Sequence, residues 1–177
     1  MTANAERGNR LKVYGASRAS LAERPATWKT LRAQGAFIVS TWIDEAEVGA
    51  TDDFRELWCR IEAEIRSADR LVLYVEAGDF PLKGAMVEVW MAIAMGKPVW
   101  VVAHGIELDQ RNLNPLGSWA RHPGVTFCEN LLEAVGLSGM SESLASIDKP
   151  NFNAGAGIER RERVIDNYWS REIIVSA

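Results

Sequence analysis

The chain has 177 residues, of which 47% are hydrophobic and 25% are charged, and these values are typical of a globular protein. Its formal net charge is −4, which argues against a protein that binds a nucleic acid polymer through a basic surface. The two cysteines, Cys59 and Cys128, have no metal-ligand spacing and suggest a reducing compartment. The N-terminus lacks an apolar signal segment, so we expect a cytoplasmic protein. We expect neither a metal nor a cofactor.

Apolar runs alternate with segments of helical periodicity from residue 10 to residue 137. The run at 84–103 is long and apolar, but Glu88, Lys97 and Pro98 interrupt it, so we expect a helix followed by a strand and not a membrane span. In chain order, the pattern predicts strands within 10–17, 36–42, 70–77, 97–104 and 124–128, and helices within 20–35, 51–68, 84–95 and 130–137. The helix within 51–68 should begin with Thr51 or Asp52 as its N-cap, and its expected apolar face comprises Phe54, Leu57, Trp58, Ile61 and Ile65.

This β-α alternation predicts a parallel sheet with right-handed crossovers. We expect an α/β, flavodoxin-like (Rossmann-like), doubly wound sheet of five strands in the order 2-1-3-4-5. The predicted domain covers 11–137, after a flexible N-terminus at 1–10. Residues 138–177 begin as a Ser/Gly/Asn-rich linker and end in a helical or extended tail, which we expect to pack on the core or on another subunit.

Polar residues lie at or just after the carboxyl ends of the predicted strands. Because ligands bind at the carboxyl ends of parallel strands, we expect these groups to converge on one edge of the sheet. They comprise Gly15, Ser17, Arg18, Trp42, Asp44, Glu76, Asp79 and His104, with Glu88 one turn into the next helix.

Most of these residues also have a structural interpretation. Ser17 and Arg18 are either a helix cap and a surface cation or a phosphate-binding turn. Trp42 is either core or a stacking surface for a nucleobase. Asp44 is typical of a solvated acidic loop, and His104 of a polar loop.

Glu88 is the one carboxylate in the apolar stretch GAMVEVWMAIAMGKPVWVV. An ionised carboxylate is costly in an apolar interior unless it is paired, hydrogen-bonded or facing a cavity. Glu88 therefore either complements its helix N-terminus or pairs with Lys83 or Arg18, or it lies at the edge of a working cleft.

Residues 67–102 resemble the nucleoside 2-deoxyribosyltransferase superfamily. The similar motifs are an Ala-Asp pair before an apolar strand, a loop at 76–83, Gly-x-x-x-Glu ending at Glu88, and Gly96-Lys97-Pro98. The stretch VYGASRAS is similar to the first loop of the related 2′-deoxynucleoside 5′-phosphate N-hydrolases, which has an arginine three residues after its glycine. The resemblance covers roughly residues 11–135.

The resemblance implies that Glu88 is an ionised nucleophile that attacks C1′ of a sugar and forms a glycosyl-enzyme ester. It also implies a homo-oligomer, a dimer or larger. Leu82 stands where the transferases have an aspartate and the N-hydrolases a serine, and Asp79 or Lys83 would have to substitute for it. Glu76 matches an aspartate near the end of the third strand.

The expected function is cleavage or transfer of the N-glycosidic bond of a (deoxy)nucleoside or nucleoside 5′-monophosphate. The predicted catalytic residues are Glu88, Asp79 and Glu76, and the predicted substrate-binding residues are Gly15, Ser17, Arg18, Trp42, Asp44, Phe80, Lys83, Gly84 and His104. Two alternatives stay open: a non-catalytic nucleotide-binding or sensor module, and a TIR-like NAD glycohydrolase, which the strand SADRLVLYV fits loosely.

Overall fold

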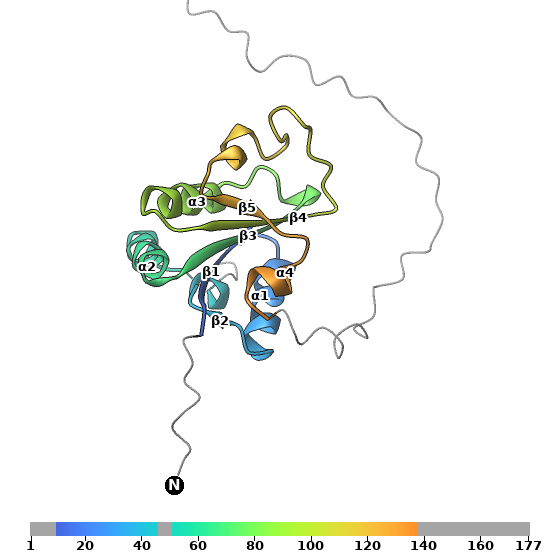
Figure 1. Ribbon diagram of the computed structural model, residues 1–177. Coiled ribbons are helices and arrows are strands. Elements are labelled where there is room, and N and C mark those ends of the chain that lie inside the picture. Colours follow the sequence, from blue (N-terminus) through green and yellow to red (C-terminus); the bar gives the residue numbers. More distant parts are fainter. Residues whose placement is uncertain (1–9, 46–50, 138–177) are drawn as a thin grey trace, which may run out of the picture. The chain divides into compact units, whose positions relative to one another are not determined.

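A parallel sheet in the order β2-β1-β3-β4-β5 organises the part of the chain that the computed structural model describes, residues 10–45 and 51–137 (Figure 1). The predicted α/β fold and strand order 2-1-3-4-5 are confirmed. The tail predicted at 138–177 and the N-terminus at 1–9 lie outside the described residues. The strands are β1 (Lys12–Ala16), β2 (Phe37–Ile38), β3 (Arg70–Glu76), β4 (Val99–His104) and β5 (Val125–Phe127).

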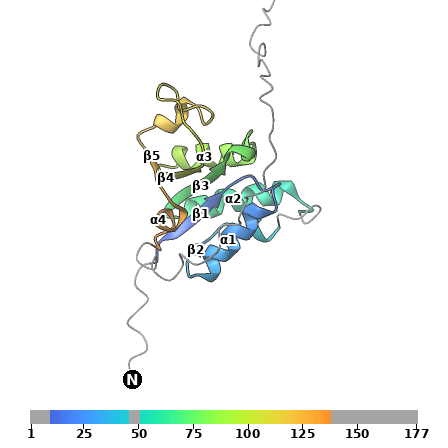
Figure 2. The same cartoon turned by 90° about the vertical axis from the view of Figure 1, so that its right-hand side faces the viewer.

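Helices cover both faces of this sheet. The longer ones are α1 (Glu23–Ala33), α2 (Phe54–Ser67) and α3 (Gly84–Ala94), and α4 (Leu131–Ala134) is a single turn. Helices α2 and α3 lie on one face, and α1 and α4 on the other (Figures 1 and 2). Short 3-10 turns complete the connections: η1 (Trp42–Asp44), η2 (Ala77–Asp79) and η3 (Ser118–Arg121). None of the helices in these two described ranges has the length and apolar character needed to cross a membrane.

The register of the two central strands decides which side chains face which helices. Tyr14 is paired with Leu71, and Gly15 with Val72. A Cβ built on Gly15 would meet the Trp28 ring of α1, so Gly15 faces α1. Because successive strand residues point to opposite faces, Tyr14 faces the layer of α2 and α3.

The second strand is much shorter than predicted. The sequence predicts a strand over 36–42, but β2 covers only Phe37–Ile38. The ladder ends because the Ser40 hydroxyl accepts the N–H of Gly15 at 2.6 Å, which places a side chain where a strand carbonyl would be. The chain then turns into η1 and buries Trp42.

The first turn of α2 also differs from its prediction. The N-cap is Asp53, not Thr51 or Asp52, because the Asp53 carboxylate accepts the N–H groups of Arg55 and Glu56 at 2.7 and 3.1 Å. Phe54, expected on the apolar inner face, is 67% exposed. Ile61 and Ile65 are buried as expected.

The contact between Gly15 and Trp28 yields a stability prediction. In Gly15→Ala the new Cβ would lie 2.8 Å from two ring atoms of Trp28, which is itself fully buried. We expect the free energy of unfolding to fall by about 1–3 kcal/mol, as for other overpacked cores. Denaturant unfolding measures this, with Gly78→Ala as the control because a Cβ there meets nothing within 4 Å. Equal stability of the two variants would contradict the close contact between Gly15 and the Trp28 ring.

Candidate functional site

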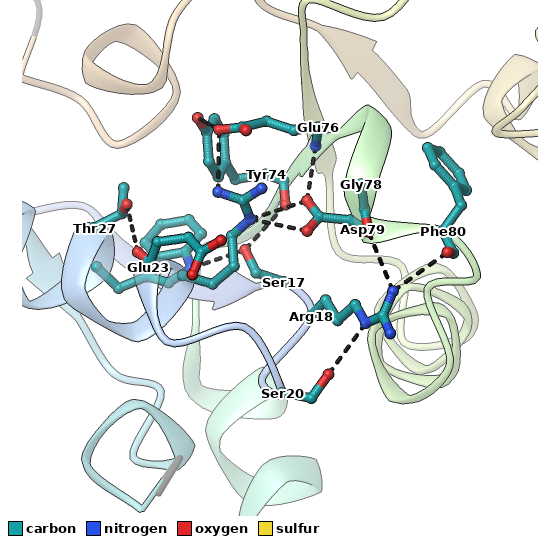
Figure 3. A network of polar contacts seen from close by, with 12 residues as sticks. Ser17, Arg18, Ser20, Glu23, Thr27, Tyr74, Glu76, Gly78, Asp79 and Phe80 are labelled. Carbon is teal, nitrogen blue, oxygen red and sulfur yellow. Dashed lines mark hydrogen bonds and ion pairs between the residues drawn. The ribbon is translucent and has the colours of Figure 1, made fainter. Parts of the chain in front are cut away.

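Figure 3 shows a polar network at the carboxyl end of β3 that includes Tyr74, Glu76 and Asp79. Its central residue is Arg24, in the first turn of α1. Its Nε donates to both oxygens of Asp79 at 3.0 Å, and its Nη1 donates to Glu76 Oε1 at 3.0 Å. The Tyr74 hydroxyl donates to the same Glu76 oxygen at 2.5 Å. Asp79 also accepts the backbone N–H of Glu76 at 2.7 Å, which closes the turn η2.

Asp79 is therefore a structural residue and not a free acid. Its side chain is fully buried and both oxygens are occupied by the guanidinium, so the predicted catalytic role of Asp79 does not fit this arrangement. Glu76 differs, because its side chain is 38% exposed. Partial burial opposes ionisation of Glu76, but hydrogen bonds from Tyr74 and Arg24 outweigh it and lower its pKa. Glu76 is thus an ionised carboxylate with access to solvent.

The first loop is largely occupied by internal hydrogen bonds. Ser17 is buried, donates to the Tyr74 carbonyl at 3.0 Å and accepts the indole N–H of Trp28 at 3.0 Å. The Gly15 N–H is bonded to Ser40. The prediction that Ser17 and Gly15 bind substrate is therefore not supported by their geometry, since both hold β1 against its neighbours.

Arg18 is the cation of this loop that is still accessible. It is half-buried, and its Nη1 donates to the carbonyls of Gly78 and Phe80 at 3.2 and 3.3 Å (Figure 3). No carboxylate lies within ion-pair distance of Arg18 in the described ranges. Its Nε also donates to the Ser20 hydroxyl at 3.1 Å. Its charge is therefore met only by neutral acceptors and is available to an anion.

Glu88 lies on the other face of the sheet, between β1 and helices α2 and α3. It is 7% exposed, and within the described residues its Oε2 has no hydrogen-bond partner. The hydroxyl of Tyr14, whose side chain is fully buried in the same layer, also has none. Glu64 of α2 is close enough for its charge to act on Glu88, and it accepts a hydrogen bond from the Thr41 hydroxyl at 2.5 Å.

The protonation state of Glu88 differs from its prediction. Burial raises the pKa of Glu88 to about 8, while the neighbouring Tyr14 hydroxyl acts in the opposite direction and the charge of Glu64 adds to the increase. Burial also raises the pKa of Tyr14 well above its usual value, and Glu88 adds to this. Glu88 is therefore mostly protonated at pH 7, whereas the sequence predicts an ionised carboxylate.

Two other predicted binding residues are engaged elsewhere. Trp42 is 5% exposed and donates its indole N–H to the Gly15 carbonyl at 2.8 Å, so it offers no stacking face for a base. Asp44 is bound by Arg32 at 2.9 Å on the outer surface.

The remaining predicted residues surround the end of β3. His104 is exposed and is paired in register with Glu76. Phe80 is half-buried, Lys83 is exposed with a φ of 45°, and Gly84 is the first residue of α3. The structure thus gathers Arg18, Glu76, Phe80 and His104 at the carboxyl edge, while Glu88 is buried on the inner side of α3. Within residues 10–45 and 51–137, no cluster of His, Cys, Asp or Glu could hold a metal ion.

Sequence reasoning missed Arg24 and Tyr14. Arg24 precedes Pro25 in the first turn of a helix, where an arginine near the sheet edge could have been suspected. Tyr14 is the one hydroxyl-bearing residue in the buried β1 strand, immediately before the loop glycine. No sequence motif marks either position, because the residues that they contact lie in distant segments of the chain. Arg24 contacts Glu76 and Asp79, and Tyr14 lies near Glu88.

The buried ion pair predicts a large effect for Arg24→Met. The change leaves Asp79 charged and fully buried without its partner, so we expect the free energy of unfolding to fall by about 3–5 kcal/mol. Arg66→Met is the control, since it removes an exposed pair with Glu62 and should cost less than about 1 kcal/mol. Adding Asp79→Asn to Arg24→Met should recover part of the loss. Equal denaturation curves for Arg24→Met and Arg66→Met would contradict the conclusion that Arg24 and Asp79 form a buried ion pair.

The raised pKa of Glu88 predicts a pH-dependent stability. Between the ordinary value of 4.5 and the folded value of about 8, the folded state holds a proton that the unfolded state has lost. This stabilisation is fully present below pH 4.5 and is lost as the pH rises through about 8, by up to about 1.4 kcal/mol per pH unit. Wild type should therefore lose stability relative to Glu88→Gln from pH 5 to 9.

Urea denaturation at several pH values measures this difference. Glu62→Gln is the control, since its side chain is 49% exposed and its curve should run parallel to that of wild type. A Glu88→Gln curve that is also parallel to wild type would show that Glu88 is not a buried titrating group.

Comparisons with known proteins bear on the fold. No family model and no curated protein matches the chain. Among solved structures, a 2-desoxiribosyltransferase from Leishmania mexicana is similar, with 17% identity and a TM-score of 0.50 over 72% of this chain and 95% of that chain. A CMP N-glycosidase from Clostridium botulinum is also similar, with 16% identity and a TM-score of 0.44 over 75% of this chain and 99% of that chain. The chain therefore shares its fold with the enzyme from Leishmania mexicana.

Proposed function

We propose that the protein cleaves or transfers the N-glycosidic bond of a (deoxy)nucleoside or nucleoside 5′-monophosphate, with Glu88 as nucleophile. The observation that carries this proposal is the buried carboxyl of Glu88, whose Oε2 has no partner in the described chain, beside the equally unpartnered hydroxyl of Tyr14. Unsatisfied buried polar groups are costly, and a catalytic role is one reason for a fold to keep them.

In this mechanism the ionised Glu88 attacks C1′ and forms a glycosyl ester, and water or a second base then resolves the ester. The C1′–N bond breaks as the ester forms, and its electron pair leaves with the base. The positive charge that develops on the sugar favours the carboxylate form of Glu88, because an opposite charge lowers the pKa of an acid. Tyr14 would donate to the carboxylate and hold it in position.

Arg18 connects substrate binding to the segment that leads into α3. Its guanidinium holds the carbonyls of Gly78 and Phe80. A 5′-phosphate would bind Arg18 more strongly than neutral carbonyls do, because charge-assisted hydrogen bonds are the stronger ones. We infer that a phosphate on Arg18 releases this segment and gives the sugar access to Glu88. Phe80, which is half-buried, would then lie against the base.

Two further groups at the edge fit a sugar and a leaving base. Glu76 Oε1 is held by Tyr74 and Arg24, and its partly exposed carboxylate would accept hydrogen bonds from sugar hydroxyls. His104 is exposed and paired in register with Glu76, where it would contact the base. Gly84 and Lys83 would contribute only the backbone at the start of α3.

A non-catalytic nucleotide-binding module is the second candidate. At the position where the transferases that this sequence resembles carry an aspartate, the chain has Leu82, which is 4% exposed. The carboxylate of Asp79 is bound by Arg24. Neither of these positions therefore offers an acid for the leaving base, which favours binding without turnover.

A base-release assay separates the two functions. Purified protein is incubated with deoxynucleosides, nucleoside 5′-monophosphates and NAD, and free base is measured by chromatography. We expect release by wild type that increases with pH toward 8 as Glu88 ionises, and none by Glu88→Gln. Glu62→Gln, an exposed carboxylate on α2, should retain wild-type activity.

Each outcome of the assay has a definite meaning. An active Glu88→Gln variant would reject the nucleophile. No release from any substrate, together with a nucleotide-induced rise in Tm, would support the binding module, since a ligand that binds only the folded state raises Tm. Release of nicotinamide from NAD alone would instead support an NAD glycohydrolase.

A further inference from the structure

The polar network around Arg24 carries an unbalanced negative charge. One guanidinium faces two carboxylates, those of Asp79 and Glu76. Asp79 is fully buried and both of its oxygens are bonded to Arg24. Glu76 is bonded through Oε1, and within the described residues its Oε2 accepts no hydrogen bond. Because the Glu76 side chain is 38% exposed, the excess negative charge faces solvent at this carboxylate.

Arg18 carries an unbalanced positive charge at the same edge of the sheet. Its guanidinium is bonded to neutral oxygens, which are two backbone carbonyls and the Ser20 hydroxyl. Asp79 lies between Arg18 and Glu76 in the view of Figure 3. The carboxyl edge therefore presents a cation and an anion as separate groups, and a ligand that carries both charges would complement both.

The other charged side chains near this edge do not cancel either charge. In the segments that follow β1, β3 and β4 they are as often acidic as basic, and all of them are exposed: Glu23, Lys83, Glu107, Asp109, Arg111 and Arg121. Water and salt screen exposed charges. Arg18 and Glu76 are partly buried, so their charges act more strongly on a ligand that displaces water from the edge.

The described part of this edge is also poor in acids that could protonate a leaving base. Asp79 is occupied by Arg24, and Leu82 is apolar. The Tyr74 hydroxyl donates to Glu76, and partial burial together with this bond raises the pKa of Tyr74. A neutral base is a poor leaving group unless an acid protonates it. A base that is already positively charged takes the electron pair of the C1′–N bond and leaves as a neutral molecule, so it needs no proton.

We propose that the site takes nucleoside 5′-monophosphates whose base carries a positive charge, such as N-alkylated purine or pyridinium nucleotides. This inference rests on the proposed N-glycosidic function and names its substrate class. The phosphate binds Arg18, and the cationic base lies in the field of the Glu76 carboxylate. A cation at this place also favours the ionised form of Glu88, because an opposite charge lowers the pKa of an acid. The Glu88 carboxylate bonds to C1′ as the base leaves, and water then adds to C1′, restores the carboxylate and gives its proton to solvent.

Binding to the unreactive Glu88→Gln variant tests the ligand class without turnover. The probes are nicotinamide mononucleotide, which has a pyridinium base, and its reduced form, whose base is neutral. Calorimetry at pH 8 should show at least about tenfold tighter binding of the cationic form, as for one charge–charge interaction in a partly buried site. Adding Glu76→Gln should remove the difference between the probes. Glu62→Gln, on the exposed side of α2, is the matched control and should preserve it.

The purine pair of 7-methylguanosine and guanosine 5′-monophosphates repeats the comparison below neutral pH. Equal affinities within both pairs would overturn the inference, even if neutral nucleotides are cleaved. A preference that survives Glu76→Gln would overturn it too, because the charge of Glu76 would not be its source. Wild type that releases guanine as fast as 7-methylguanine, with a loss of guanine release in His104→Gln, would overturn it by making His104 the acid.

Base release by wild type separates this inference from the proposed function. A preference for the cationic probes without release of any base would support the ligand class and reject Glu88 as nucleophile. Far-UV circular dichroism checks that Glu76→Gln is folded, since Glu76 also binds Arg24 and Tyr74. If that variant does not fold, the salt dependence of the preference replaces it. A preference due to charge decreases as ionic strength increases, and one that does not change would overturn the inference.

Discussion

The buried ion pair between Arg24 and Asp79 connects elements that are far apart in the sequence. Both groups are almost entirely removed from water, so neither charge is tolerable without the other. Through this contact, the first turn of α1 is held against η2, and η2 leads directly into α3. The position of α3, and therefore of Glu88, depends on a guanidinium that belongs to a helix on the opposite face of the sheet.

The two faces of the sheet consequently carry different polar chemistry. The α1 face has the ionised groups Arg24, Glu76 and Asp79 in mutual hydrogen bonds, and the neutral hydroxyl of Tyr74 donates to Glu76. The opposite face has Tyr14 and Glu88, which are neutral at pH 7 because burial disfavours their charged forms. Strand alternation produces this separation, since Tyr14 faces α3 while Tyr74 and Glu76 face α1. The carboxyl edge is where the two kinds of group come together.

The apolar composition of α3 has consequences on both of its sides. On the inner side it removes water from Glu88, which raises the pKa of that carboxyl to about 8. On the outer side it leaves Val87 and Trp90 exposed to solvent.

The alternation of strand and helix patterns was sufficient to predict the parallel sheet, its 2-1-3-4-5 order and the unusual character of Glu88. The parallel sheet follows from local periodicity, and the strand order is the common one for a flavodoxin-like sheet. Glu88 is unusual because it is the one carboxylate in an apolar run. The same patterns placed Ser17, Trp42 and Asp79 at the carboxyl edge as candidate binding or catalytic residues, with structural roles left open for Ser17 and Trp42. Only the tertiary structure shows that all three are engaged within the fold. Ser17 is bonded to Tyr74 and Trp28, Trp42 to Gly15, and Asp79 to Arg24. Arg24 and Asp79 are 55 positions apart, and periodicity contains no information about such a pairing. The charge state of Glu88 was likewise decided by packing, since desolvation depends on what surrounds a carboxyl and not on the residues beside it in the chain.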